Sequence, residues 1–126
     1  KNLTVLARGE ESADEYRLTP NELYHLGQRL VAKGDHAAAH EHLTQLFKEW
    51  QLDPEPFKNT VEWLFTTSLA ANSSREIVAY FEIIKEKFPE VEVSFENILK
   101  VAAAYRDLGE HERSYLVYRA TDERSF

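Results

Sequence analysis

The sequence predicts an all-α protein, organised as a solenoid of about three antiparallel helical hairpins. Apolar residues recur at spacings of three and four through three successive segments, which is the pattern of helices with one buried face. A short polar or glycine-containing break divides each segment near its middle, as a helical hairpin requires. Gly27, Phe65 and Ala102 occupy equivalent places in the three segments, separated by 38 and 37 residues, so the same plan repeats.

The first predicted hairpin covers about residues 20–50. Thr19, Pro20 and Glu22 supply a capping hydroxyl, a proline at the first helical position and an acidic residue three after the cap, which together predict a capping box. Gly34 and Asp35 are expected to end this helix and cap the next. The apolar positions at helical spacing are Leu23, Leu26, Leu30 and Val31 in the first helix, then Ala39, Leu43, Leu46, Phe47 and Trp50 in the second.

The second and third predicted hairpins cover about residues 56–88 and 95–122. Ser73 with Glu76 predicts a second capping box, and Ser94 is the expected cap of the third hairpin. The apolar positions are Val61, Leu64, Phe65, Leu69, Ile77, Tyr80, Phe81 and Ile84, then Ile98, Val101, Ala102, Tyr105, Tyr115, Leu116 and Tyr118. We expect Leu26, Leu64 and Val101 to point into one shared interior.

Residues 1–18 depart from this plan, and residues 19–126 form the predicted helical repeat domain. The segment has apolar residues near its start and then four acidic ones, Glu10, Glu11, Asp14 and Glu15. We interpret it as an N-terminal extension or linker, with a short strand as the alternative. The chain begins with lysine, and we expect it to be a fragment of a longer protein.

The composition excludes several functional classes. The 126 residues include no cysteine, which rules out disulfides, thiolate zinc sites and cysteine nucleophiles but leaves the compartment open. The formal net charge of -7 repels phosphate backbones, so we expect no nucleic-acid partner. No apolar run approaches the ~20 residues of a membrane span, so we expect no direct membrane insertion.

No residue pattern points to catalysis, a cofactor or a metal. His36 and His40 are four apart and share a helix face, which would suit zinc or nickel, but no third ligand is fixed by spacing. Packing is the preferred explanation for both histidines. The carboxylates lie in linker-like sequence or on predicted polar faces, and no nucleophile elbow or glycine-rich phosphate loop is present. We therefore expect a protein that is not an enzyme and needs no cofactor.

The repeats resemble the tetratricopeptide repeat family, as three degenerate copies. The first matches through Leu23, Leu26-Gly27, Leu30, Gly34-Asp35, Ala39 and Leu43, and the third through Val101-Ala102, Tyr105, Gly109-Glu110, Ser114 and Tyr118. The middle copy keeps Leu64, Phe81 and Pro89. The resemblance implies a right-handed stack of hairpins.

Small residues are usual where the two helices of each such hairpin cross. The resemblance places Gly27 against Ala39 and Ala102 against Ser114. The middle copy instead has Phe65 and Ile77 at these places, and bulky pairs widen a crossing from about 8 Å to about 10 Å. We therefore expect the middle hairpin to be splayed.

The resemblance also implies a function, which is to hold a peptide or protein partner on the concave face. The residues expected to line that face are Tyr24, Gln28, Val31, Glu62, Thr66, Leu69, Leu99, Ala103 and Arg106. Chaperone-binding members grip a C-terminal carboxylate with Lys and Asn side chains. At the matching places this chain has one basic residue, Lys100, beside Glu96, so we expect no such binding.

An architectural role is the alternative function. The last predicted helix presents Tyr115, Leu116 and Tyr118 with no following repeat to cover them. The module would then be an oligomerisation spacer within a larger multi-repeat assembly, or it would self-associate through this C-terminal helix.

Overall fold

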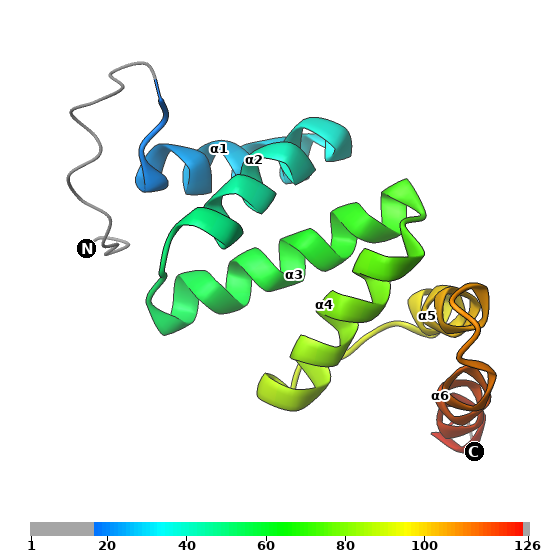
Figure 1. Ribbon diagram of the computed structural model, residues 1–126. Helices are drawn as coiled ribbons and strands as arrows, with labels where there is room; N and C mark the ends of the chain where they lie inside the picture. The colour runs from blue at the N-terminus through cyan, green and yellow to red at the C-terminus, as the bar shows by residue number, and fades with distance from the viewer. Residues whose placement is uncertain (1–16, 125–126) are drawn as a thin grey trace. The chain divides into compact units, whose positions relative to one another are not determined.

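The computed structural model describes the backbone of residues 17–124 and the side chains of residues 17–120 (Figure 1). This part of the chain consists of six helices and contains no strand, which confirms the predicted all-α class. The helices are α1 (Pro20–Lys33), α2 (His36–Glu49), α3 (Pro54–Ala71), α4 (Ser74–Lys87), α5 (Phe95–Asp107) and α6 (His111–Arg124). Most of the predicted N-terminal extension lies outside the described residues. Within residues 17–124, no helix combines the length and apolar character that crossing a bilayer requires.

The caps of the first hairpin form as predicted. The hydroxyl of Thr19 accepts a hydrogen bond from the Glu22 backbone N–H at 3.1 Å, and the Glu22 carboxylate accepts one from the Thr19 backbone N–H at 2.9 Å. Gly34 ends α1 in the left-handed region at φ 86°, where a residue without a Cβ is favoured. Asp35 then caps α2 by accepting from the Ala38 N–H at 3.4 Å.

The predicted capping box at Ser73 is wrong. Ser73 is the N-cap of α4, but its side chain makes no capping hydrogen bond. The Ser73 backbone differs from those of the two hydroxyl caps, with ψ 97° against 164° at Thr19 and 156° at Ser94; Asp35 does cap α2 at ψ 74°, but with a longer side chain. Ser73 takes that conformation in a tight turn, in which Asn72 has φ 55° and the Ser73 N–H donates to the Ser68 carbonyl at 3.2 Å.

The helices divide into two compact units, unit 1 (Lys1–Thr67) and unit 2 (Ser68–Phe126), so the boundary falls inside α3. In unit 1, α1 and α2 pack together as a hairpin (Figure 1). A Cβ on Gly27 would lie 2.6 Å from the Leu43 Cγ, so only glycine allows this approach. The nearest side-chain atoms all belong to Leu43, one turn beyond the Ala39 that the resemblance predicted. The buried apolar residues of the unit are Leu23, Ala39, Leu43, Leu46, Val61, Leu64 and Phe65.

Unit 2 contains the last turn of α3 together with α4, α5 and α6. Helix α5 packs against both α4 and α6. The predicted meeting of Ala102 and Ser114 is confirmed, since the buried Ser114 hydroxyl donates to the Ala102 carbonyl at 2.8 Å. On α4, one oxygen of the Glu82 carboxylate accepts from the Tyr105 hydroxyl of α5 at 2.7 Å and from the Arg113 guanidinium of α6 at 2.9 Å.

Leu64 and Val101 are fully buried, as predicted, but they belong to different units, so their one shared interior stays a prediction. Leu26 is only partly buried and lines an open hollow along α1, so the prediction that it points into the interior is wrong. Phe65 and Ile77 are both buried but belong to different units, so the splayed middle hairpin stays a prediction.

Candidate partner-binding face

The first helices of the first two predicted hairpins meet in unit 1. The Tyr24 ring on α1 lies against the Trp63 indole on α3, with ring centroids 5.1 Å apart and planes tilted by 48°. Asn59, one turn before Trp63, donates from its side-chain amide to the Tyr24 hydroxyl at 2.8 Å. These contacts place one face of α1 beside one face of α3.

We call this surface the α1–α3 face. On α1 its members are spaced by four and three residues, and on α3 they lie within two turns of one side, so each set shares a side of its helix. None of its side chains is fully buried. The face consists of Tyr24, Gln28 and Val31 on α1 and of Asn59, Glu62, Trp63 and Thr66 on α3.

The chemistry of the face suits recognition of a peptide. Tyr24 and Trp63 provide a flat apolar platform, and such aromatic residues bury a large area at low entropic cost. Gln28 and Asn59 carry amides that can donate to or accept from a peptide backbone. Glu62 is the one charged member, so it favours a basic side chain nearby.

The nine predicted lining residues fall in both units. Unit 1 holds Tyr24, Gln28, Val31, Glu62 and Thr66, and all five belong to the α1–α3 face. Unit 2 holds the other four, of which Leu99 and Ala103 are partly exposed and Arg106 is exposed. Leu69 is only 6% exposed, so the prediction that it lines a binding surface is wrong. Leu69 lies near the end of α3, where three consecutive residues, Thr67, Ser68 and Leu69, are all buried. A helix with one face open to a partner would leave at least one of three consecutive residues more exposed.

Sequence reasoning missed two members of the face. Neither Trp63 nor Asn59 is among the nine residues that the resemblance placed on the concave face. A signal for both existed, because Asn59 precedes Glu62 by three residues and Trp63 precedes Thr66 by three, a spacing that puts each pair on one side of a helix. Aromatic residues at helical spacing do not reveal whether a side chain lies inside the core or at its edge, because both positions have the same period.

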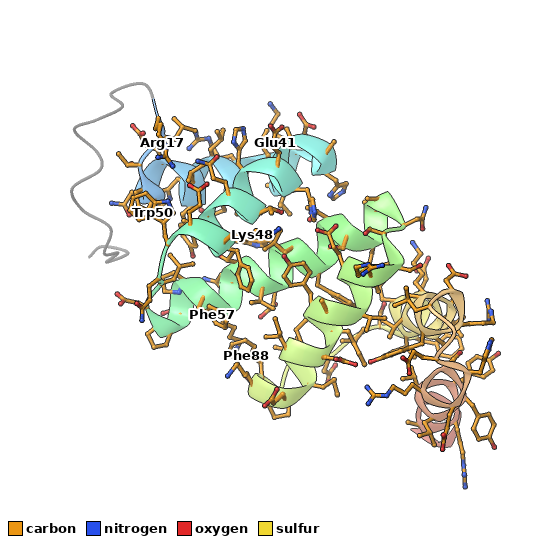
Figure 2. All side chains as sticks on the ribbon, in the orientation of Figure 1. Arg17, Glu41, Lys48, Trp50, Phe57 and Phe88 are labelled. Atoms are coloured by element: carbon orange, nitrogen blue, oxygen red, sulfur yellow. The ribbon has the colours of Figure 1, made fainter. Side chains whose placement is uncertain are left out.

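Two hollows of unit 1 lie outside this face. One, of about 340 Å³, lies along α1 and is lined by Leu18, His25, Leu26 and Arg29 among others. The second, of about 550 Å³, lies where α2 ends and α3 begins, around the labelled Lys48, Trp50 and Phe57 of Figure 2. At its edge, Glu49 is held by Arg17 at 2.7 Å. Neither hollow contains a predicted lining residue.

His40 has a structural role in unit 1. The Thr67 hydroxyl donates its single hydrogen to the Leu64 carbonyl at 3.1 Å. The His40 Nδ1 lies 2.6 Å from the same hydroxyl, and this hydrogen bond ties α2 to α3. Among the described residues, no group of three or more His, Asp or Glu side chains is arranged to hold a metal ion.

The two tyrosines with strongly raised pKa values belong to unit 2. Burial, together with the neighbouring Glu76 carboxylate, raises the pKa of Tyr80 to about 12. Burial, followed by the hydrogen bond to Glu82, also raises the pKa of Tyr105. Both shifts favour the neutral phenol, so these residues contribute packing and hydrogen bonding rather than reactivity.

No family model, no curated protein and no solved structure matches the chain. The resemblance to tetratricopeptide repeats stays a prediction from the sequence.

Proposed function

We propose that this chain is a protein–protein interaction scaffold, a right-handed tetratricopeptide-like solenoid that binds a peptide or protein partner on its concave face. Its helices pair as hairpins with short turns, α1 with α2 and α5 with α6. The close approach at Gly27 and the contact of Ser114 with Ala102 fit the small residues that such hairpins need. Binding is by surface complementarity, and no covalent step is involved.

One observation carries the proposal: Tyr24, Asn59 and Trp63 join α1 to α3. The first helices of successive hairpins are the ones that line the concave face in the resembling family. The five lining residues predicted in unit 1 lie on these two helices, and the contact between the helices supports the proposal that they share one surface. A groove formed by neighbouring helices suits an extended peptide or an amphipathic helix.

The same surface indicates the chemistry of the partner. An apolar side chain would pack on the platform of Tyr24 and Trp63, which is the kind of anchor that dominates binding energy. A Lys or Arg close to that anchor would pair with Glu62. The chain's net charge of -7 would speed the approach of a basic partner.

A peptide library displayed on phage tests this function. Peptides selected on the chain are titrated into the Trp50→Phe variant, which leaves Trp63 as the sole tryptophan. Binding at the α1–α3 face should change the Trp63 emission in a saturable way. The selected peptides should be enriched in a bulky apolar residue near a basic one.

Charge-matched variants locate the site. Gln28→Arg and Thr66→Arg each add one positive charge to an exposed position of the face, and each should weaken binding by at least about tenfold. Ala37→Arg adds the same charge to an exposed position of α2 and should leave affinity unchanged. A library that enriches no peptide, or affinities that fall equally in all three variants, would contradict the proposal.

A further inference from the structure

Helix α6 has two unlike sides. One side faces its own unit, where Ser114 is buried against α5 and the Arg113 guanidinium binds Glu82 of α4. Val117 is partly buried on the same side. The contacts of α6 with α5 and with Glu82 of α4 therefore lie on one flank of it, and several exposed residues lie on the opposite flank.

That opposite flank is apolar at its centre and charged at its ends. Tyr115 is 59% exposed and Leu116 51% exposed. Glu112 and Arg119 are also exposed and lie three residues before Tyr115 and three after Leu116. At about 100° per residue, all four positions fall within an arc of about 100°, which we call the α6 outer face.

The order of residues on this face is self-complementary. When two copies of a helix pack antiparallel about a two-fold axis, each residue meets the one equally far from the axis on the other side. With the axis between Tyr115 and Leu116, Tyr115 lies against Leu116 of the second copy. Glu112 then lies against Arg119 of the second copy, and the symmetry gives this opposite-charge contact twice.

We propose that the α6 outer face binds the α6 outer face of a second copy of this chain, in antiparallel orientation. The charges select this occupant and this orientation, because a parallel pair would place Glu112 against Glu112 and Arg119 against Arg119. Self-association through the C-terminal helix was the alternative function expected from the sequence, and this pairing assigns it to a specific surface. It uses a different surface from the α1–α3 face, so it can fail while peptide binding succeeds.

The dimer should be weak and reversible. Only one helix of each copy contributes, which places the contact at the small end of protein interfaces. We expect a dissociation constant of about 10–500 µM. Sedimentation equilibrium across that range should show the mass rising from 14.6 kDa toward twice that value.

Substitutions on α6 distinguish this specific pairing from non-specific hydrophobic association. Tyr115→Gln and Leu116→Gln should each keep the chain monomeric, with an unchanged thermal melt because both side chains are exposed. Tyr118→Gln is the matched control, since Tyr118 is 55% exposed but lies about 110° from the centre of the face. Equal loss of the dimer in the control would overturn the proposed geometry.

Charge reversal provides the decisive test. Glu112→Lys and Arg119→Glu should each be monomeric alone, because each places like charges opposite one another. A one-to-one mixture of these two variants should form a heterodimer, and a single chain carrying both changes should dimerise again. A parent chain that stays monomeric over the whole range, or a mixture that does not associate, would refute the pairing.

Discussion

At the scale of single residues, Gly27 decides how closely α1 and α2 approach. A Cβ there would lie 2.6 Å from the Leu43 Cγ, and Leu43 is fully buried, so it has little room to move. Alanine is more favourable than glycine inside a helix by about 1 kcal/mol. We expect the steric overlap of the alanine Cβ with Leu43 to outweigh that gain. Gly27→Ala should lower the free energy of unfolding by about 1–2 kcal/mol and Gly27→Leu by more, as measured by urea unfolding.

A double-mutant cycle checks that Leu43 is the cause. Leu43→Ala alone should cost about 2–5 kcal/mol because it empties a packed site. In that background Gly27→Ala should cost nothing or stabilise the helix, since the overlap is gone. If Gly27→Ala leaves the parent chain as stable as before, α1 and α2 are not held this closely.

Tyr80 should make the stability of unit 2 sensitive to alkaline pH. Its phenol is 6% exposed, and its pKa is raised to about 12 from an ordinary value near 10. The unfolded chain therefore loses this proton at lower pH than the folded chain does. The contribution of the neutral Tyr80 phenol to the free energy of unfolding is fully present below about pH 10 and is lost as the pH rises toward 12. The total loss should be on the order of 1–2 kcal/mol.

Urea unfolding at about pH 8, 10 and 11.5 measures this effect. Tyr80→Phe should reduce the loss of stability between the two higher pH values, although Tyr105 will contribute a similar loss of its own because its pKa is also raised. An identical pH dependence in the parent chain and in Tyr80→Phe would contradict the burial of this phenol.

At the scale of helices, three N-cap residues of similar chemistry should differ in their contribution. Thr19 and Ser94 accept hydrogen bonds from the first turns of α1 and α5, whereas the Ser73 side chain makes no such bond at α4. Thr19→Ala and Ser94→Ala should each lower the free energy of unfolding by about 1 kcal/mol. Ser73→Ala should change it by less than about 0.3 kcal/mol.

The three alanine variants serve as controls for one another, because each removes one hydroxyl from an N-cap position. Urea unfolding of the set under one buffer condition gives the comparison. A loss at Ser73→Ala as large as that at Ser94→Ala would mean that Ser73 caps α4 in solution, with a backbone closer to that of the other two caps.

At the scale of the whole molecule, α3 connects the two units. It is one continuous helix of 18 residues, and the boundary between units falls inside it at Thr67. Breaking a helix in its middle costs the hydrogen bonds and packing of the adjoining turns. We therefore expect the units to unfold together rather than one after the other.

The two tryptophans make this testable, since Trp50 and Trp63 both lie in unit 1. Ile84 is 1% exposed in unit 2, and Ile84→Ala should cost about 2–5 kcal/mol. The tryptophan fluorescence transition of that variant should move to lower urea together with the far-ultraviolet circular dichroism transition. A fluorescence transition that stays in place would show that the units unfold independently.

Local chemistry explains which parts of the fold were predictable. The apolar periodicity predicted each helix, and the capping residues predicted where α1, α2 and α5 begin, because these signals act within one or two turns of the chain. The contact of Ser114 with Ala102 was predictable because a short turn leaves few ways for two adjacent helices to meet. Five of the seven residues of the α1–α3 face followed from position within the repeat.

The predictions that failed have two causes, a local turn at Ser73 and packing against other helices at Leu26 and Leu69. The Ser73 cap is lost because the preceding turn, with Asn72 in the left-handed region, fixes its backbone. Leu26 and Leu69 have similar apolar character, yet one lines an open hollow and the other is buried. Periodicity assigns a residue to a side of its helix and does not say what lies against that side.

The sequence by itself determined the helices, most of their caps and the pairing of α1 with α2 and of α5 with α6, because those outcomes follow from short-range hydrogen bonding and helical spacing. Only the tertiary structure decided that Asn59 and Trp63 meet Tyr24 and that Leu26 is partly exposed while Leu69 is buried. Both depend on which helices approach each other, and that choice is made by the packing of side chains far apart along the chain.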